Sequence, residues 1–403
     1  MINFGGHSEF EVVIIGQQPW DVEIGSNSKD LALELSKKHR VLYVNSPLDR
    51  VTLYREWKNP RVKKRRAIIK NKKIEIVKIQ ENLWNLYPDC MLESINWIGS
   101  NFIFDWANKY NNYKFAQSIK KALKLLGFSN FMLLNDNEMF KGFHLKEFLD
   151  PVLSIYYSRD NMVAVPYWRR HGLRLEPAII AKYDLCITNS TYLTDYCRQF
   201  NTNSFYVGQG CDFKFFTGIP GPYPFAEKFS GPVIGYVGAL ESARLDQDII
   251  AYLAKNKPDW TIIMVGPEDN AFKAGKLHSF KNIIFAGIKP MEMLADYIRI
   301  FDVCINPQLI NEVTIGNYPR KIDEYLVMGK PVVVSATATM ESFKDFVSLA
   351  KSKEDYLELI ESALRDDNAE LQKARTEYAL THTWENSVDK IYRAIEKTIS
   401  AHK

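Results

Sequence analysis

Short apolar runs recur along the whole chain, and they are the feature that most constrains its fold. They are rich in β-branched residues, are bounded by Gly, Pro, Asn or Asp, and alternate with segments of helical periodicity. Continuous apolar runs, rather than alternating ones, are typical of parallel strands buried on both faces. The runs form a first series at 11–16, 40–45, 73–79, 130–136, 153–160, 184–190 and 204–210, and a second at 232–238, 260–267, 282–287, 302–307 and 330–336. The sequence therefore predicts an α/β protein with parallel sheets.

A proline-rich stretch, "TGIPGPYPFAEKFSGP" at 217–232, divides the two series. A chain of 403 residues is also too long for one ordinary core. We therefore expect two doubly wound, Rossmann-like domains, 1–216 and 232–384, joined by a linker at 217–231 and facing a cleft. The apolar stripe of "TWENSVDKIYRAIEKTIS" predicts a final helix, which we assign to 385–403.

Composition excludes several classes of function. Lys and Arg number 52 against 48 Asp and Glu, a balance that does not indicate nucleic-acid binding. Five dispersed cysteines without C-x-x-C spacing predict reduced thiols rather than disulfides or a zinc site. We see no signal peptide at the start and no apolar run long enough to span a membrane, so we expect a cytoplasmic protein.

The segment "GNYPRKIDEYLVMGKPVVV" at 316–334 reads as a helix, a turn and a buried strand. Pro319 suits a first helical turn, and Gly329 stands where a left-handed C-cap would lie. Arg320 and Lys321 fall at the helix start, where each cation costs about 0.3–1 kcal/mol. An ion pair of Arg320 with Glu324 would stabilise the helix by only about 0.2–0.5 kcal/mol. The alternative is a bound diphosphate at this position, with Glu324 accepting hydrogen bonds from a ribose.

A second loop in the same half supports a phosphate site. In "GYVGALESARLD" at 235–246, Gly238 ends a strand and lets the backbone approach a ligand. Arg244, six residues later, suits a phosphate oxygen.

These residues, in this order, resemble the GT-B glycosyltransferases, specifically the bacterial family-four-like group (glycosyl transferases group 1) that builds polysaccharides. "YVGALESARLD" is similar to a loop of that family, and "PRKIDEYLVMGKPVV" is similar to its most recognisable block. "KYDLCITNSTYLTDYCRQF" with the following "GCD" resembles its last N-domain unit, and "TWENSVDKIY" resembles a final helix that crosses back to the N-terminal domain.

The resemblance implies a sugar-nucleotide site in the C-terminal domain. Lys321 and Arg244 would hold the diphosphate, Glu324 the ribose, and Gly16 would approach the donor from the N-terminal domain. The expected donor-binding set is Gly16, Gly238, Arg244, Gly316, Asn317, Tyr318, Arg320, Lys321 and Glu324. Two positions depart from the family pattern: Gly316 stands where many relatives carry Glu, and Ala239 where many carry Arg.

The implied reaction transfers a glycosyl group from a UDP- or GDP-linked donor to an acceptor hydroxyl. Fixed cations would stabilise the leaving diphosphate, so we expect no metal and no cofactor, and we interpret the acids of 135–140 as a loop or helix cap. Asp160 and Glu324 are the catalytic candidates. Asp160 is the first choice of base, with an N-cap or a pair with Arg159 as the alternative. In a retaining enzyme, like the resembled family, the leaving phosphate takes that proton instead.

Two segments predict contact with a membrane. Residues 61–73 hold a dense run of Lys and Arg, for which a solvated hairpin is the plain alternative. Residues 91–110 place Ile95, Ile98, Phe102 and Trp106 near one face of an expected helix. Basic residues with Trp and Phe are typical of interfacial segments, so we expect peripheral binding to the inner leaflet near a lipid-linked acceptor.

Two other functions stay open. A sugar-nucleotide epimerase shares the two-domain architecture but needs no separate acceptor. A non-catalytic, donor-binding assembly subunit is the second alternative, and Gly316 is the feature that favours it.

Overall fold

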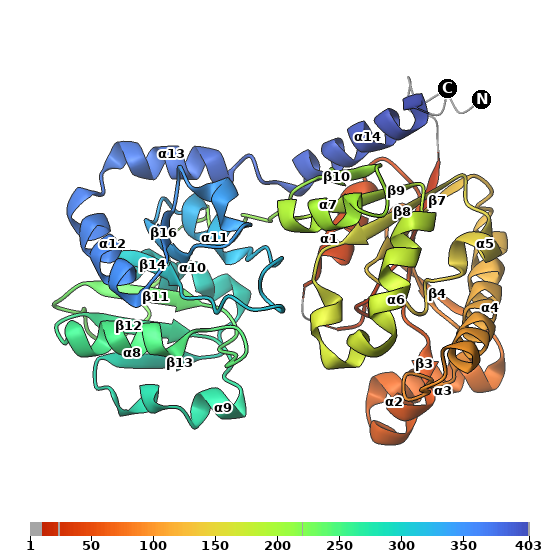
Figure 1. The fold of residues 1–403 in the computed structure, drawn as a ribbon, viewed down its shortest axis with the longest axis horizontal. Helices are drawn as coiled ribbons and strands as arrows, with labels where there is room; N and C mark the ends of the chain where they lie inside the picture. The colour runs from red at the N-terminus through yellow and green to blue at the C-terminus, as the bar shows by residue number, and fades with distance from the viewer. Residues whose placement is uncertain (1–9, 23–24, 220, 402–403) are drawn as a thin grey trace. The chain divides into compact units, whose positions relative to one another are not determined.

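The computed structural model describes residues 10–22, 25–219 and 221–401, and it divides into two compact units (Figure 1). Unit 1 runs to Gly208 and takes in the chain from Ser387, whereas unit 2 spans Gln209–Asn386. The stretch expected to be a linker, 217–231, falls within unit 2 in this division, and its Phe225 and Phe229 pack against the unit 2 core.

Unit 1 is built on an eight-stranded sheet of order β10-β9-β8-β7-β1-β2-β5-β4. The strands are β1 Glu11–Ile15, β2 Val41–Val44, β4 Glu75–Gln80, β5 Leu83–Tyr87, β7 Phe131–Asp136, β8 Leu153–Ser158, β9 Leu185–Thr188 and β10 Ser204–Tyr206, with a separate pair β3 Leu48–Asp49 and β6 Met91–Leu92. All neighbours in the large sheet pair in parallel except β4 and β5. The expectation of a buried parallel strand at 73–79 is therefore wrong: β4 is a half-exposed antiparallel edge strand, and β5 was missed.

Helices cover both faces of this sheet. They are α1 Asn27–Leu35, α2 Arg50–Arg55, α3 Pro60–Asn71, α4 Asn101–Leu126, α5 Leu145–Leu149, α6 Pro166–Lys182, α7 Thr191–Arg198 and α14 Trp384–Ala401, with a 3-10 turn η1 at Met162–Ala164. Apolar side chains of α4, α5 and α6 join one core cluster with the inward residues of the strands. The other face carries α1, whose Ser28 hydroxyl lies 3.1 Å from the Tyr43 hydroxyl of β2.

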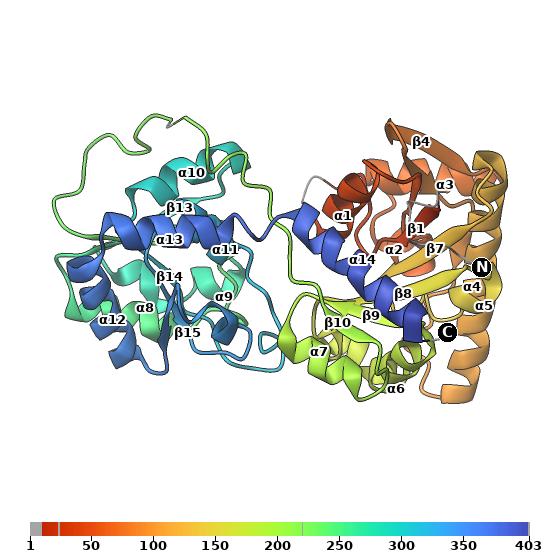
Figure 2. The ribbon, with the colours of Figure 1, turned by 90° about the horizontal axis from the view of Figure 1, so that it is seen from above.

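The C-terminal helix α14 returns to unit 1, as the sequence predicts. Its Val388, Ile391, Ala394 and Ile395 are buried. Its Tyr392 hydroxyl lies 2.9 Å from Nε2 of His39, and Figures 1 and 2 show the helix lying across unit 1.

Unit 2 has a six-stranded parallel sheet of order β13-β12-β11-β14-β15-β16. The strands are β11 Val233–Val237, β12 Thr261–Val265, β13 Ile283–Gly287, β14 Val303–Asn306, β15 Val332–Ser335 and β16 Ser348–Ala350. The helices are α8 Gln247–Asn256, α9 Asn270–Lys273, α10 Met291–Ile300, α11 Lys321–Val327, α12 Lys353–Asp366 and α13 Ala369–Ala379, with 3-10 turns η2 Lys276–Ser279 and η3 Met340–Phe343. Residues of α10, α11 and α13 pack on one face, and residues of α8 and α12 on the other.

Parallel strands in this order bring their carboxyl ends, and the loops that follow them, to one edge of each sheet. In the part of the chain that the structure describes, no helix combines the length and apolar character needed to cross a bilayer.

Candidate active site

The segment 316–334 folds into the predicted helix, turn and strand, but the helix begins at Lys321, so Pro319 precedes it and Arg320 is its N-cap residue. Helix α11 spans Lys321–Val327, and the left-handed turn lies at Gly329, with φ 72°. The amide of Gly329 donates to the Leu326 carbonyl (2.9 Å) and that of Lys330 to the Tyr325 carbonyl (3.1 Å), which closes the helix end. Strand β15 follows directly. The short helix therefore presents its first residue, Lys321, at the edge of the sheet.

The Lys321 side chain lies against the end of β11. Its ammonium donates a hydrogen bond to the Tyr236 hydroxyl and lies 4.0 Å from the centre of that ring. Within the described chain Lys321 makes no ion pair with a carboxylate. Burial lowers the pKa of Lys321 to about 7, with Glu324 acting in the opposite direction. The site thus holds a lysine whose charged form is disfavoured by burial and that makes no ion pair with a described residue, although the Glu324 and Glu241 carboxylates lie near enough to favour its charge.

Two glycines let the backbone pack tightly beside this lysine. A Cβ on Gly238 would lie 2.5 Å from Lys321 Nζ, and the φ of Gly238 is 141°. Gly266, which follows β12, has φ 147°, and a Cβ there would lie 1.9 Å from the Gly238 carbonyl oxygen. The sequence predicts that the backbone at Gly238 approaches a ligand, and in the structure it lies close to the Lys321 side chain. Gly266 was missed, although it also follows an apolar strand directly.

Arg244 lies in the loop after β11, on the same side as Lys321. Its Nε pairs with Glu241 at 2.8 Å, and both side chains are close to half exposed. The Leu309 amide donates to the Arg244 carbonyl (2.8 Å), so this loop is tied to the one that follows β14. Arg244 adds to the lowering of the Lys321 pKa, which places their charges within interacting range.

Glu324 lies one turn after Lys321. Burial raises the pKa of its carboxyl above the usual range, while the charges of Arg320 and Lys321 act to lower it. The structure thus brings Gly238, Arg244, Lys321 and Glu324 to one edge of unit 2.

The other predicted donor-binding residues of unit 2 lie in the segment just before α11, and they differ in burial and in hydrogen bonding. Tyr318 is buried, and its hydroxyl donates to Asp323 (2.8 Å). Gly316 is buried, Asn317 is partly buried and donates its amide hydrogen to the Thr314 carbonyl (3.0 Å), and Arg320 is the N-cap residue of α11. Tyr318 therefore supports the helix from within the core.

A buried carboxylate, Asp323, was missed by the sequence interpretation. It accepts hydrogen bonds from Tyr318 and from Cys211 (3.5 Å), and its Oδ1 lies 2.6 Å from Nδ1 of His382. The Cys211 amide also donates to the His382 carbonyl (2.9 Å). Asp323 thus ties α11 to the first and the last segments of unit 2. No spacing in the sequence signals the contacts with Cys211 and His382, because these two partners lie far from Asp323 along the chain.

In unit 1, Gly16 and Asp160 lie at the carboxyl ends of β1 and β8. A Cβ on Gly16 would lie 2.1 Å from the Tyr43 hydroxyl, so the side of Gly16 that faces Tyr43 is already filled. Arg159 joins the two ends, because it donates to Gln17 Oε1 (3.0 Å) and to Asp160 Oδ2 (2.6 Å). The pair of Asp160 with Arg159, the alternative to its role as a base, is therefore present.

Two acids with cationic partners lie at the end of β7, the strand between β1 and β8, and in the loop that follows it. Asp136 is fully buried and accepts from Arg159 Nε (2.7 Å), and its Oδ2 has no hydrogen-bond partner among the described residues. Glu138 pairs with Lys141 (3.0 Å) and accepts the amide hydrogens of Phe140 and Lys141. Glu138 thus lies in a loop and accepts backbone amide hydrogens, as the interpretation as a loop or cap expects, whereas Asp136 is the last residue of β7.

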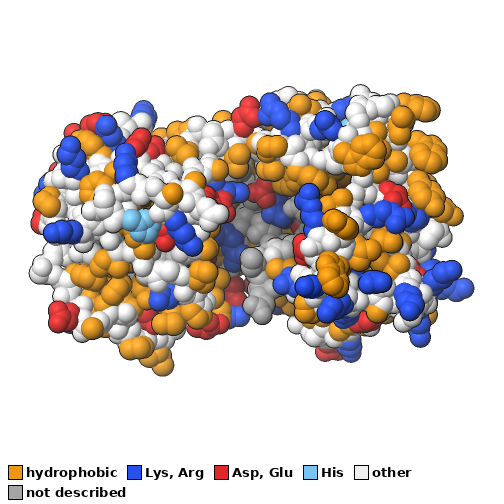
Figure 3. Space-filling view, turned by 90° about the horizontal axis from the view of Figure 1, so that it is seen from below, with side chains coloured by type: hydrophobic (Ala, Val, Ile, Leu, Met, Phe, Trp, Pro, Cys, Tyr) orange, Lys and Arg blue, Asp and Glu red, His pale blue; other side chains and the backbone are white. Residues whose placement is uncertain are grey.

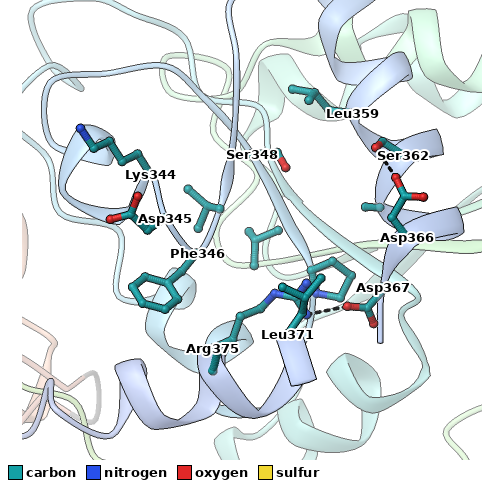
Figure 4. Close-up of a pocket in the computed structure, with 15 residues that line it drawn as sticks. Lys344, Asp345, Phe346, Ser348, Leu359, Ser362, Asp366, Asp367, Leu371 and Arg375 are labelled. Atoms are coloured by element: carbon teal, nitrogen blue, oxygen red, sulfur yellow. Dashed lines mark hydrogen bonds and ion pairs between the residues drawn. The ribbon is translucent and has the colours of Figure 1, made fainter. Parts of the chain in front are cut away.

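A separate hollow of about 330 Å³ in unit 2 lies beside α12, α13 and β15 (Figure 4). Arg375, at its wall, donates to Asp367 (2.7 Å) and to the Gly329 carbonyl (2.8 Å). Its guanidinium therefore fastens the end of α11 to α13.

Comparison with solved structures defines the class of fold. Aligned over 98% of this chain and all of theirs, sucrose-phosphate synthase from Thermosynechococcus elongatus gives a TM-score of 0.68 at 15% identity, and Anabaena HepE in complex with UDP and glucose gives 0.62 at 14%. An E. coli structure bound with UDP-2-fluoro glucose gives 0.63 at 11% identity, over 95% of this chain and 98% of that one. The chain has the GT-B fold that the sequence predicts.

Comparison of sequences finds a family match for part of the chain. Residues 231–366 match the family model described as "Glycosyl transferases group 1", which confirms the resemblance for this part of unit 2. A putative teichuronic acid biosynthesis glycosyltransferase, TuaH of Bacillus subtilis (strain 168), is 33% identical over 107 residues. That stretch covers 26% of this chain and 26% of TuaH.

Proposed function

We propose that the chain is a glycosyltransferase that moves a sugar from a nucleoside-diphosphate donor to a hydroxyl of a glycan or lipid-linked acceptor, in the synthesis of a bacterial surface polysaccharide. The observation that carries this proposal is Lys321, a lysine with a lowered pKa that makes no ion pair with a described residue and whose ammonium lies beside the backbone at Gly238. An anion bound there would supply the missing charge. The polysaccharide role is supported by the likeness to the teichuronic acid enzyme.

The donor diphosphate would lie between Lys321 and Arg244, with Glu324 toward the ribose. As the bond to the sugar breaks, negative charge grows on the diphosphate, and fixed cations stabilise that charge without needing to rearrange. We therefore propose a metal-independent reaction without a cofactor. A UDP-linked donor is favoured because related folds bind UDP, while GDP stays the alternative.

The acceptor would bind unit 1, where Gln17, Asp136, Arg159 and Asp160 meet. The charges there are already paired, which suits a neutral hydroxyl better than an anion. We propose that the reaction retains configuration, so that an oxygen of the leaving phosphate takes the acceptor proton and Asp160 positions the hydroxyl. We also propose that unit 1 contacts the inner face of the cytoplasmic membrane.

The test is nucleotide release from a panel of UDP- and GDP-sugars, with and without acceptors. Release that requires an acceptor and yields a glycosylated product supports the proposal. A new sugar epimer formed without acceptor would show an epimerase instead. Tight donor binding with no turnover on any acceptor would show an assembly subunit, the function that Gly316 favours.

A further inference from the structure

The basic and aromatic segments of unit 1 adopt a different structure from the one expected. Residues 60–71 form helix α3 and not a hairpin, and two of its cations are used internally: Lys64 pairs with Glu75 (2.7 Å) and Arg65 with Asp21 (2.8 Å). Helix α4 begins only at Asn101, so Ile95 and Ile98 lie in the preceding loop and pack against the core. The single amphipathic helix expected over 91–110 is therefore wrong.

What remains exposed is a set of aromatic side chains that the core does not use. On α4, Phe102, Trp106, Tyr110 and Tyr113 follow one another at helical spacing, and Phe102 is 83% and Trp106 is 68% exposed. Trp97, in the loop before α4, is 75% exposed, and Trp57, between α2 and α3, is 57% exposed. We call these six residues the aromatic surface. In Figure 3, apolar and basic side chains alternate over the face of unit 1 that is seen from below.

Trp97 is exposed although its loop is firmly held. The indole Nε1 donates to the Ser94 carbonyl (2.7 Å), and Arg170 donates to the Trp97 carbonyl (2.8 Å). His171 of α6 is buried, and its Nε2 lies 2.9 Å from the Ile98 carbonyl oxygen. A large apolar side chain on an ordered loop loses little conformational freedom when another surface covers it.

Beside Trp97 is a hollow of about 670 Å³, which we call the arginine pocket. It is lined by Asp49, Val51, Thr52, Arg55, Ser94, Ile95, Asn96, Trp97, Pro166, Tyr167 and Arg170. Arg55 makes no ion pair with any described residue, and Arg170 bonds only to carbonyl oxygens. The one acid, Asp49, already accepts hydrogen bonds from Thr52 and Ser94, and these hydrogen bonds hold its pKa below the usual range despite its burial. The pocket is therefore net positive.

We propose that the arginine pocket binds the phosphate of an anionic phospholipid headgroup while the aromatic surface inserts into the adjoining leaflet. Arginine suits this role because its planar fork can donate two hydrogen bonds to one phosphate. Indole and phenyl rings lie favourably at the level of the headgroups. The exposed cations of α3, among them Arg66 and Lys70, add attraction that does not depend on the pocket.

This inference rests on the proposed membrane contact, and vesicle flotation tests it. The full chain is mixed with phosphatidylcholine vesicles that contain or lack phosphatidylglycerol. Arg55→Gln is compared with Arg66→Gln, which removes the same charge from α3, outside the pocket. We expect binding only to the anionic vesicles, a loss of roughly tenfold or more for Arg55→Gln, and a loss of roughly fivefold or less for Arg66→Gln.

Equal losses of vesicle binding for Arg55→Gln and Arg66→Gln would show diffuse electrostatic attraction only. They would overturn the proposal that the arginine pocket binds a headgroup. Equal binding to both kinds of vesicle would overturn the anionic headgroup, and unchanged binding of Trp97→Ser with Phe102→Ser would overturn insertion. Nucleoside-diphosphate affinity is measured on every variant. If the protein binds nucleotide but does not float with vesicles, the membrane inference alone is refuted. If it floats with vesicles but does not bind nucleotide, the donor site alone is refuted.

Discussion

The two units differ in whether the cationic side chains at the ends of their strands form ion pairs. In unit 1, Arg159 lies between Asp136 and Asp160, and Lys141 pairs with Glu138, so the cations are neutralised where they stand. In unit 2, the ammonium of Lys321 meets a tyrosine hydroxyl and makes no ion pair with a described residue. Pairing avoids the cost of an isolated buried charge, whereas a partly buried lysine without an ion pair is suited to an anionic ligand. This difference is the reason why we propose the diphosphate site in unit 2.

The largest expected effect is on the stability of unit 1. Arg159→Met leaves the buried Asp136 carboxylate without its cation, which costs about 3–5 kcal/mol. Arg174→Met is the matched control, because its pair with Asp105 is exposed and its loss costs at most about 1 kcal/mol. Urea unfolding followed by circular dichroism measures both. Similar small losses of unfolding free energy in the two variants would contradict the comparison between the units, because Arg159 would then not be compensating a buried charge.

The next effect is on binding by unit 2. Lys321→Met should weaken nucleoside-diphosphate binding by about 1.5–3 kcal/mol, because a charge-assisted hydrogen bond is lost. Its stability should hold or rise, since a desolvated cation is removed. Isothermal calorimetry with the exposed Lys255→Met of α8 as control measures the affinity. Unchanged affinity in Lys321→Met would place the donor elsewhere.

A smaller effect should follow from moving Lys321 without removing it. Gly238→Ala would put a methyl group 2.5 Å from Lys321 Nζ and so displace the ammonium, and we expect a loss of affinity of about 1 kcal/mol. Gly287→Ala is the control, because Gly287 also has a positive φ, of 68°, but a Cβ there meets nothing within 4 Å. Both variants lose stability through backbone strain. Only Gly238→Ala should lose affinity, and equal losses would mean that strain alone is responsible.

The smallest effect is expected for Arg244→Ala. Because its side chain is close to half exposed and already paired with Glu241, its contribution is at most about 1 kcal/mol. The same titration measures it. A loss as large as that of Lys321→Met would show that Arg244 reorients to become a principal phosphate ligand.

Most of the fold, and the helix that carries Lys321, could be predicted from the sequence. The continuous apolar runs identified most strands of both sheets, and the punctuation of 319–331 identified α11 and its left-handed end, because these signals are local. The edge strand β4 was misjudged because its residues are apolar enough to look buried. The start of α4 was misjudged because the apolar residues before it serve the core from a loop.

The partners of charged groups could not be predicted in the same way. Arg159 meets Asp136 only because β7 and β8 are neighbours in the sheet, and Asp323 meets His382 across unit 2. Such contacts depend on topology rather than on spacing along the chain. The lowered pKa of Lys321 likewise comes from burial that only the folded unit supplies.

The most direct test of the central claim is proton uptake when a nucleoside-diphosphate sugar binds, measured by calorimetry in buffers of different ionisation enthalpy. The diphosphate of such a donor is a diester and does not titrate near neutrality. With a pKa of about 7, Lys321 is largely protonated at acidic pH and largely neutral in mild alkali, and a bound diphosphate raises its pKa again. Uptake should therefore be small at acidic pH, approach one proton in mild alkali, and vanish in Lys321→Met. Binding with no uptake at any pH, or uptake that persists in Lys321→Met, would contradict the account.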